Sequence, residues 1–214
     1  MKPRLLLFLF FLLPLVLSAQ QWRFGAEVAT GHSWEIERLP FRAAATEFTG
    51  VAGGVGVSLA AVLEYELGAF ALSARPGILY QGTEVFRRFA DDDGGMSVRR
   101  PVYEYGLLLP AYLRWSFGRQ RTRPFLRLGG GLLVDLGGGT TDPLPAAAPV
   151  LPFAEVAVGL SVRTRRLALR PTLSVRNGTG ELFLGNRVGF AGQRWGYAAV
   201  GVVVIGAGGA SAAR

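Results

Sequence analysis

Apolar residues recur at every second position over long stretches of this chain, and this alternation constrains its fold more than any other feature. The pattern runs through residues 54–67, 70–81 and 103–117, where small or charged residues fill the positions between. Because successive side chains of a β-strand point to opposite faces, the pattern predicts long strands with one apolar face. After the apolar run at the N-terminus, no segment has the 3.6-residue period of an amphipathic helix. The sequence therefore predicts an all-β chain.

The alternation predicts eight strands, an even number that suits a closed barrel. They are residues 21–31, 52–67, 70–82, 101–118, 124–137, 152–164, 167–178 and 194–206. The connections at one end are short: Gly68–Ala69, Arg165–Arg166 and the region 119–123. Those at the other end, 31–51, 83–100, 138–151 and 179–193, are long. This asymmetry is typical of outer-membrane proteins, so we expect an eight-stranded antiparallel up-and-down transmembrane β-barrel.

The two-residue turns also predict the register of the strands. The first places Leu59 opposite Ile78 on the apolar face, and the second places Glu155 opposite Arg176 on the other face. Two arginines suit a tight turn with positive φ poorly, so a slightly longer second loop is an alternative. Three predicted strands contain a proline. Because proline has no backbone N–H to donate to the ladder, we expect a local bulge at each one. The prolines are Pro76, Pro110 and Pro171.

The apolar face is expected to meet lipid and the other face to line a narrow lumen. Small residues between the charges suit the inside of an eight-stranded barrel, which side chains just fill. Two sets of aromatic residues predict interfacial girdles. The set at the short-turn end is Trp22, Phe24, Tyr65, Phe70, Trp115 and Phe117, and the set at the other end is Tyr80, Tyr103, Tyr105, Trp195 and Tyr197. A soluble calyx with its apolar face inward is the alternative arrangement.

Charges of both signs fall on the predicted lumen face, where opposite charges can pair. An unpaired charge there costs several kcal/mol, so we expect a hydrogen-bonded network. Its predicted members are Glu27, Glu64, Glu66, Arg75, Glu104, Arg114, Arg127, Glu155, Arg163, Arg170 and Arg176.

The first residues have the features of a secretory signal. Lys2 and Arg4 precede the apolar run Leu5–Leu17, and small residues follow up to Ala19. A membrane anchor, the alternative, needs roughly 20 apolar residues. We therefore expect a signal peptide at 1–19, a barrel domain at 20–206, a tail at 207–214 and a location in the outer membrane.

Composition excludes several function classes. The chain has 214 residues, half of them hydrophobic and 18% charged, with no cysteine and one histidine. It is too apolar for a disordered protein and has no residues for disulfides, thiolate chemistry or a multi-histidine metal centre. We expect no metal and no cofactor. The net charge of +8 comes from dispersed arginines, so nucleic acid is not expected as a partner.

The strands around the first short turn carry recognisable motifs. Gly56–Leu67 has a glycine-rich start and the acidic–aromatic pair Glu64-Tyr65, and the next strand has Arg75-Pro76 followed by Leu79-Tyr80. With these motifs the chain resembles the PorT-like family of small outer-membrane β-barrels common in Bacteroidetes, which is related in design to OmpX-type barrels. Residues 103–109 resemble the following strand of the family, with Gly106 in place of the usual proline. The resemblance implies a fold and a location but no single activity.

Other candidate sites are weak. His32, Ser33 and Glu35 form the only His-Ser-acid cluster, as a lipid A hydrolase would need, but adjacent strand residues point to opposite faces. Asp91–Gly95 lacks the spacing of a calcium loop and is read as an acidic loop. Arginines near the short-turn rim either bind lipid phosphates or are simply solvated. These are Arg119, Arg121, Arg123, Arg163, Arg165 and Arg166.

The sequence thus predicts an integral outer-membrane barrel with a structural or interaction role through its long outer connections, and not an enzyme. The expected partners are outer-membrane lipid and, through the outer connections, lipopolysaccharide or other envelope proteins, with the barrel itself a monomer. The alternatives are narrow porin-like transport of small solutes, a lipid A-directed hydrolase and a soluble periplasmic lipid-binding calyx.

Overall fold

The computed structural model describes residues 22–36, 47–89, 97–101, 103–118, 120–137, 148–181 and 194–206. The expected signal peptide (1–19), the tail (207–214) and the acidic run at 91–95 lie outside these residues. The described part of the chain contains no helix long and apolar enough to span a membrane.

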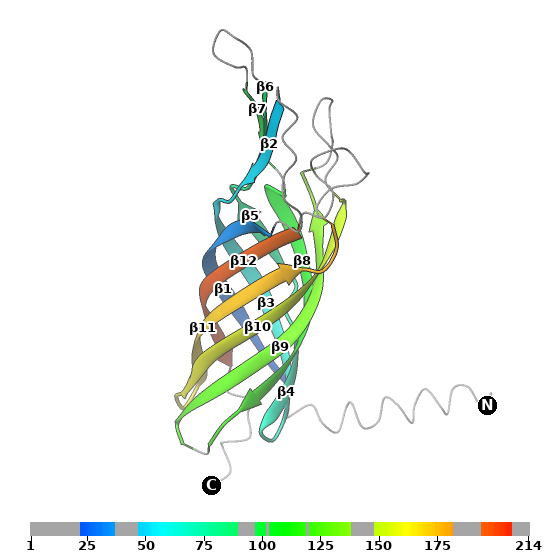
Figure 1. The fold of residues 1–214 in the computed structure, drawn as a ribbon. Coiled ribbons are helices and arrows are strands. Elements are labelled where there is room, and N and C mark those ends of the chain that lie inside the picture. Colours follow the sequence, from blue (N-terminus) through cyan, green and yellow to red (C-terminus); the bar gives the residue numbers. More distant parts are fainter. Residues whose placement is uncertain are drawn as a thin grey trace, which may run out of the picture.

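The described strands form a closed antiparallel barrel, as the alternation predicts (Figure 1). The wall consists, in chain order, of β1 (Trp22–Ile36), β3 (Val55–Leu67), β4 (Phe70–Ala74) with β5 (Gly77–Gln81), β8 (Tyr105–Ser116), β9 (Thr122–Asp135), β10 (Val150–Arg163), β11 (Leu167–Gly178) and β12 (Arg194–Gly206). β4 and β5 are two halves of one wall strand, since both pair with β3 and β8. The first and last strands pair with each other, which closes an eight-stranded wall.

Two of the predicted long loops contain strands that the alternation did not reveal. β2 (Glu47–Ala52), β6 (Glu84–Phe89) and β7 (Ser97–Pro101) form a separate three-stranded antiparallel sheet, with β6 in the middle. This sheet, the extension, rises beyond the barrel at the end opposite the short turns (Figure 1). At its base, the Ser33 hydroxyl lies 2.5 Å from that of Thr83, and the backbone N–H of Gly54 donates to the Ser33 oxygen at 2.9 Å.

The predicted register is confirmed on both faces. Leu59 pairs with Ile78, and Glu155 pairs with Arg176. At the first turn, Gly68 alone has positive φ (66°), which is typical of a type II′ hairpin. At the second, the Thr164 N–H donates to the Leu167 carbonyl at 2.8 Å, so the turn is closed after two residues. No positive φ is recorded for either arginine there, which removes the objection to this short turn.

The predicted bulges at the prolines are wrong. The register between β8 and β9 is the same before and after Pro110, and that between β11 and β12 is the same on both sides of Pro171. Pro76 interrupts the strand between β4 and β5 without shifting its register against β3. Pro76 and Pro110 still accept backbone hydrogen bonds, from Ala61 at 2.9 Å and Arg75 at 3.2 Å. Each proline therefore removes one donor from the ladder, and the neighbouring pairs hold the strands in place.

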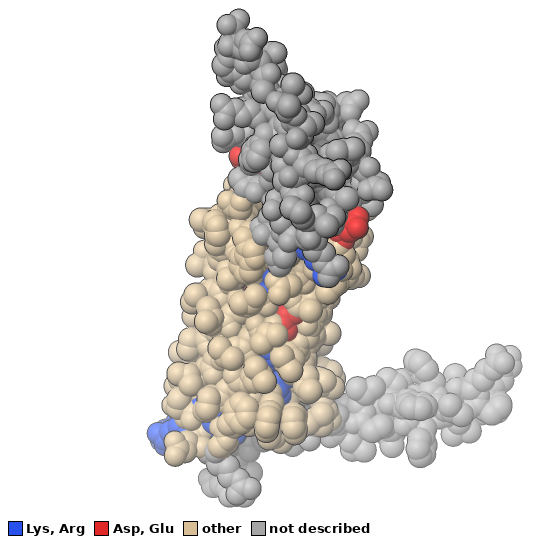
Figure 2. Space-filling model, in the orientation of Figure 1, with Lys and Arg blue, Asp and Glu red and all other residues tan. Residues whose placement is uncertain are grey.

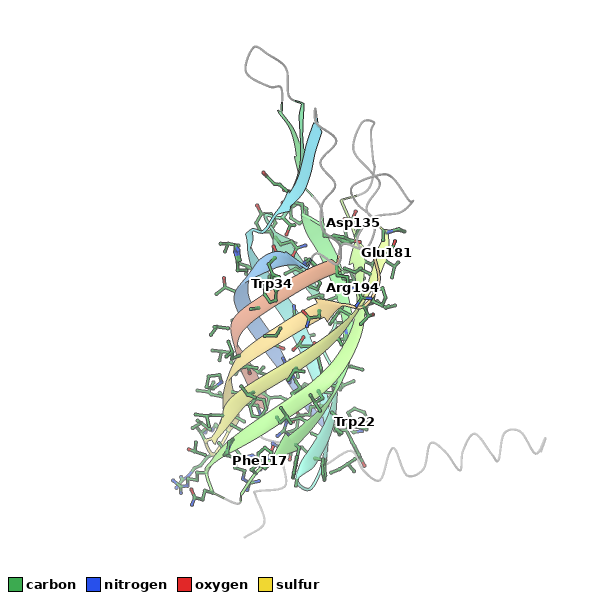
Figure 3. All side chains as sticks on the ribbon, viewed as in Figure 1. Trp22, Trp34, Phe117, Asp135, Glu181 and Arg194 are labelled. Carbon is green, nitrogen blue, oxygen red and sulfur yellow. The ribbon has the colours of Figure 1, made fainter. Side chains whose placement is uncertain are left out.

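The outer wall is apolar over its whole height, and the charges lie inside. Thirty large hydrophobic side chains are exposed on the described residues, among them Leu59 (62%) and Val200 (61%). Figure 2 shows a mostly uncharged wall, with basic atoms at the end of the short turns and a few acidic and basic atoms farther up this face. Trp22 and Phe117 lie near that end, and Trp34, Asp135, Glu181 and Arg194 lie near the other (Figure 3).

The aromatic girdle at the short-turn end follows the prediction, but the other girdle is partly wrong. At the short-turn end, Trp22 contacts Tyr65 and Trp115 contacts both Phe70 and Phe117. At the other end, Tyr80 and Tyr105 face outward with their ring centroids 5.3 Å apart.

Tyr103, Trp195 and Tyr197, also assigned to that girdle, are instead buried in the barrel. Both faces of β12 are rich in apolar residues, so its sequence does not indicate which face turns inward. Tyr103 has positive φ (52°), which breaks the alternation before β8.

The seam between β1 and β12 can be tested with a designed disulfide, because the chain has no cysteine. Thr30 and Val200 are directly paired, and opposite residues of antiparallel strands have Cα atoms about 4.5–5.5 Å apart, within disulfide range. We expect Thr30→Cys with Val200→Cys to cross-link on oxidation, seen as a shifted band of boiled, non-reduced protein on a gel.

The matched control is Thr30→Cys with Val204→Cys, which displaces the second cysteine by about 13 Å along β12. Equal cross-linking of the two pairs would contradict the closed register.

Candidate functional site

A cluster of six charged side chains, the lower cluster, fills the lumen near the short turns. It consists of Arg23, Glu64, Glu66, Arg114, Arg163 and Arg170. Arg114 binds both oxygens of Glu64, through Nη2 at 2.9 Å and Nε at 3.3 Å, and Arg170 Nη1 lies 2.7 Å from Glu64 Oε2. Glu64 and Arg170 have no exposed side-chain surface. Buried carboxylates are stable only when paired in this way.

Glu66 holds the part of the lower cluster that water reaches. Its two oxygens lie 2.7 Å from Arg23 Nη2 and from Arg163 Nη2. The exposed fractions of these side chains are 14% for Glu66, 15% for Arg23 and 30% for Arg163. The lumen is thus open to water at the short-turn end.

A second cluster, the middle cluster, lies further along the lumen. Its members are Glu27, Arg75, Tyr112, Arg127, Glu155 and Arg176. Glu155 binds Arg127 at 2.5 Å and Arg176 at 2.6 Å, and it accepts a hydrogen bond from the Tyr112 hydroxyl at 2.6 Å.

The two carboxylates of the middle cluster are linked through shared arginines. Glu27 binds Arg75 at 2.6 Å and lies 3.6 Å from Arg127. The residues form a chain in which arginines alternate with glutamates, each carboxylate lying between two guanidiniums.

The ring of Tyr112 organises the middle cluster. The guanidinium carbons of Arg75 and Arg127 lie 5.5 Å and 4.6 Å from its centroid, within cation–π range. Tyr112 was not among the predicted network members, although it lies on the charged face of its strand in the alternation. Gly129, its cross-strand partner on β9, leaves room for the ring: a Cβ there would lie 2.6 Å from Tyr112 Cδ1.

Buried apolar and aromatic residues, the apolar plug, fill the lumen at the end of the long connections. The plug consists of Ala29, Leu79, Tyr103, Leu108, Leu133, Leu151, Phe153, Trp195, Tyr197 and Ala199. Its members come from all around the wall, and each is at most 5% exposed. The Tyr103 hydroxyl donates to the Ala148 carbonyl, which joins two of the long connections. Burial, and then the nearby Asp135, raise the pKa of Tyr103, so its hydroxyl stays a donor. The sequence reading missed the plug because its aromatic residues were assigned to the outer face.

The structure brings ten of the eleven predicted network residues together, and Arg23, which the alternation also places on the lumen face, joins them. The exception is Glu104, which is half-buried beside Tyr103. Its backbone carbonyl accepts a hydrogen bond from the Gln81 N–H at 3.0 Å, and the described contacts include no ion pair of its carboxylate. Glu104 lies beyond the start of β8, where the alternation ends.

The remaining candidate residues do not gather into a site. His32 is exposed and Ser33 is fully buried, so the two side chains lie on opposite sides of the wall. Nor does the described part of the chain contain a group of three or more potential metal ligands. Of the rim arginines, Arg163 turns into the lumen, whereas Arg165 and Arg166 are exposed on the turn.

Comparison with known proteins gives only distant similarities. No family model and no curated protein matches the sequence. Among solved structures, the chain is similar to neisserial surface protein A (16% identity, TM-score 0.42, 85% of this chain and 96% of that one). It is also similar to OprG of Pseudomonas aeruginosa, with 11% identity and a TM-score of 0.44 over 86% of this chain and 92% of that one. A third similar structure is the N-terminal β-barrel domain of OprF from the same organism, with 14% identity and a TM-score of 0.38 over 85% of this chain and 98% of that one. The fold assignment rests on the strand pairing of this chain.

The two carboxylates of the lower cluster differ in burial, and this predicts different effects of removing their charges. Glu64→Gln removes the nearest carboxylate from Arg114 and Arg170 in a dry environment and leaves them only Glu66, at 3.4 Å and 3.7 Å, so we expect the free energy of unfolding to fall by about 3–5 kcal/mol. Glu66→Gln is the matched control and should cost less, because water reaches its arginines. Urea unfolding in detergent micelles, followed by tryptophan fluorescence, measures both. A Glu64→Gln variant as stable as the wild type would contradict this description of the lower cluster.

Proposed function

We propose that this chain is an integral outer-membrane β-barrel with a structural or interaction role, carried by the connections at the end opposite the short turns. The observation that supports it most is the reversed distribution of polarity, with an apolar outside and an ionic inside. Soluble monomers rarely expose apolar patches larger than a few hundred Å². Here exposed apolar side chains cover the barrel wall on all strands, which suits hydrocarbon as the surrounding solvent.

A soluble calyx needs the opposite orientation, with an apolar interior to receive its ligand. In this barrel the lower and middle parts of the lumen hold ion pairs, and the apolar part is already filled by the plug. Described side chains occupy both regions, so the calyx is the weaker hypothesis.

A transport role is also disfavoured, because the ion pairs and the apolar plug fill the lumen. The middle cluster crosses the lumen with side chains that are almost fully buried, and the plug follows it toward the long connections. A small eight-stranded barrel has no further room for a continuous aqueous path.

The extension supports an interaction role. β2 and β7 are its edge strands, and each pairs only with β6 among the described strands. Edge strands present unpaired backbone donors and acceptors that another chain can bind. We therefore place recognition of lipopolysaccharide or envelope proteins at this end, and we propose no catalytic role, because His32 and Ser33 point to opposite sides of the wall.

Spin labels on the outer wall test the membrane location. We expect labels at Leu59→Cys and Leu109→Cys, in protein reconstituted into vesicles, to be relaxed by oxygen and not by a water-soluble nickel chelate. Both side chains face outward from the middle of the wall. Arg166→Cys on the exposed turn is the control and should respond to the nickel chelate. Strong nickel relaxation at Leu59 or Leu109 would refute the proposal.

Planar-bilayer recordings test the absence of transport. The wild-type protein should show no steady conductance, because the apolar plug closes the lumen. Removing two of its side chains, with Leu133→Ala and Trp195→Ala together, should produce small channel events. Leu109→Ala, on the outer face, is the control and should behave like the wild type. Steady conductance of the wild-type protein would favour the porin-like alternative.

A further inference from the structure

We propose that the lumen binds a small inorganic anion of the chloride type against Arg75 and Arg127 in the middle cluster. This goes beyond the proposed function, since it concerns the inside of the barrel and does not depend on what the outer connections recognise.

Unused hydrogen-bond donors gather around the Tyr112 ring. Among the described residues, no acceptor lies within hydrogen-bond distance of Nε and Nη2 of Arg75, or of Nε and Nη1 of Arg127. The Ser73 hydroxyl, which belongs to the cross-strand partner of Tyr112, is likewise without a partner there. All three residues are at most 5% exposed. A buried donor left unsatisfied costs about 1–3 kcal/mol, and more when it is charged.

These donors flank Tyr112, on the wall strands that pair with either side of β8. Ser73 and Arg75 are on β4 and directly after it, Tyr112 is on β8, and Arg127 is on β9. Arg75 and Arg127 both lie over the Tyr112 ring, and both approach the Glu27 carboxylate. Two guanidiniums held by one ring and one carboxylate form a fixed pair of donors for an anion.

The charge of the lumen points the same way. The ion pairs of the described residues join seven arginines to four glutamates, which leaves three positive charges in excess. One of these belongs to the middle cluster, where Arg75, Arg127 and Arg176 face only Glu27 and Glu155. An uncompensated charge in a dry lumen is costly, and a bound anion would neutralise it.

Access and size restrict the choice of anion. Water reaches the lumen at Arg23 and Arg163, and the other arginines of the lower cluster, which attract anions, lie between these residues and the middle cluster. Because side chains nearly fill a barrel of this width, a monatomic ion fits better than an organic acid.

Bromide is the direct probe, because it replaces chloride and scatters X-rays anomalously. Crystals of the full barrel grown in detergent with sodium bromide should show an anomalous peak within hydrogen-bond distance of the free nitrogens of Arg75 and Arg127. Density for water alone at these nitrogens, without an anomalous peak, would overturn the proposal.

Solution measurements use two substitutions with opposite expected effects. Halide binding is followed as the rise in Tm when chloride replaces gluconate at constant ionic strength. Arg75→Gln removes two of the free donors, so chloride affinity should fall about tenfold or more. Glu27→Gln removes a competing negative charge, so chloride affinity should rise. Arg166→Gln, on the exposed turn, is the matched control and should bind chloride like the wild type.

Arg75→Gln and Glu27→Gln are expected to change chloride affinity in opposite directions, so each tests the proposal even if the other variant does not fold. An unchanged chloride effect in Arg75→Gln, or an unchanged or weaker one in Glu27→Gln, contradicts an anion at this place. The proposed membrane location and the absence of transport are tested separately by the spin labels and the conductance, so failure of one inference is distinguishable from failure of the other.

Discussion

Each carboxylate of the lumen network lies between at least two guanidiniums, and the interior of this barrel depends on that arrangement. Glu64 is held by Arg114 and Arg170, and Glu155 by Arg127 and Arg176. A carboxylate can accept several hydrogen bonds and a guanidinium can donate five, so a few residues build a continuous network. The outer face can be largely apolar because the charges of this network find partners inside the barrel. Because seven arginines of the network face four glutamates, this pairing leaves three positive charges without a matching negative charge.

Much of the fold could be predicted because a strand offers only two faces. Once Gly68–Ala69 and Arg165–Arg166 are read as turns, each residue of the adjoining strands has one possible partner, and a slip by one residue would turn the charged face outward. The same rule assigned ten of the predicted charges to the interior. It assigned Trp195 and Tyr197 of β12 to the wrong face, because both faces of that strand are apolar, and it included Glu104, which lies where the alternation stops and has no ion pair among the described contacts.

Other features depend on contacts that have no local pattern in the sequence. The apolar plug joins residues from many strands, and the role of Tyr112 follows from arginines on two neighbouring strands. The extension was missed because β2, β6 and β7 are short. The prolines were expected to disturb the wall more than they do, since strands with long ladders on both sides tolerate one missing donor.

Several ion pairs bridge strands that are not neighbours in the wall, and this has a consequence for assembly. Glu64 on β3 binds Arg170 on β11, and Glu27 on β1 approaches Arg127 on β9. Such partners meet only when the sheet has curled so that β1 reaches β12. Until then the arginines are unneutralised and must stay hydrated, so an open sheet cannot enter hydrocarbon without carrying water with it. Insertion into a bilayer and closure of the seam are therefore expected to be a single concerted event for this chain.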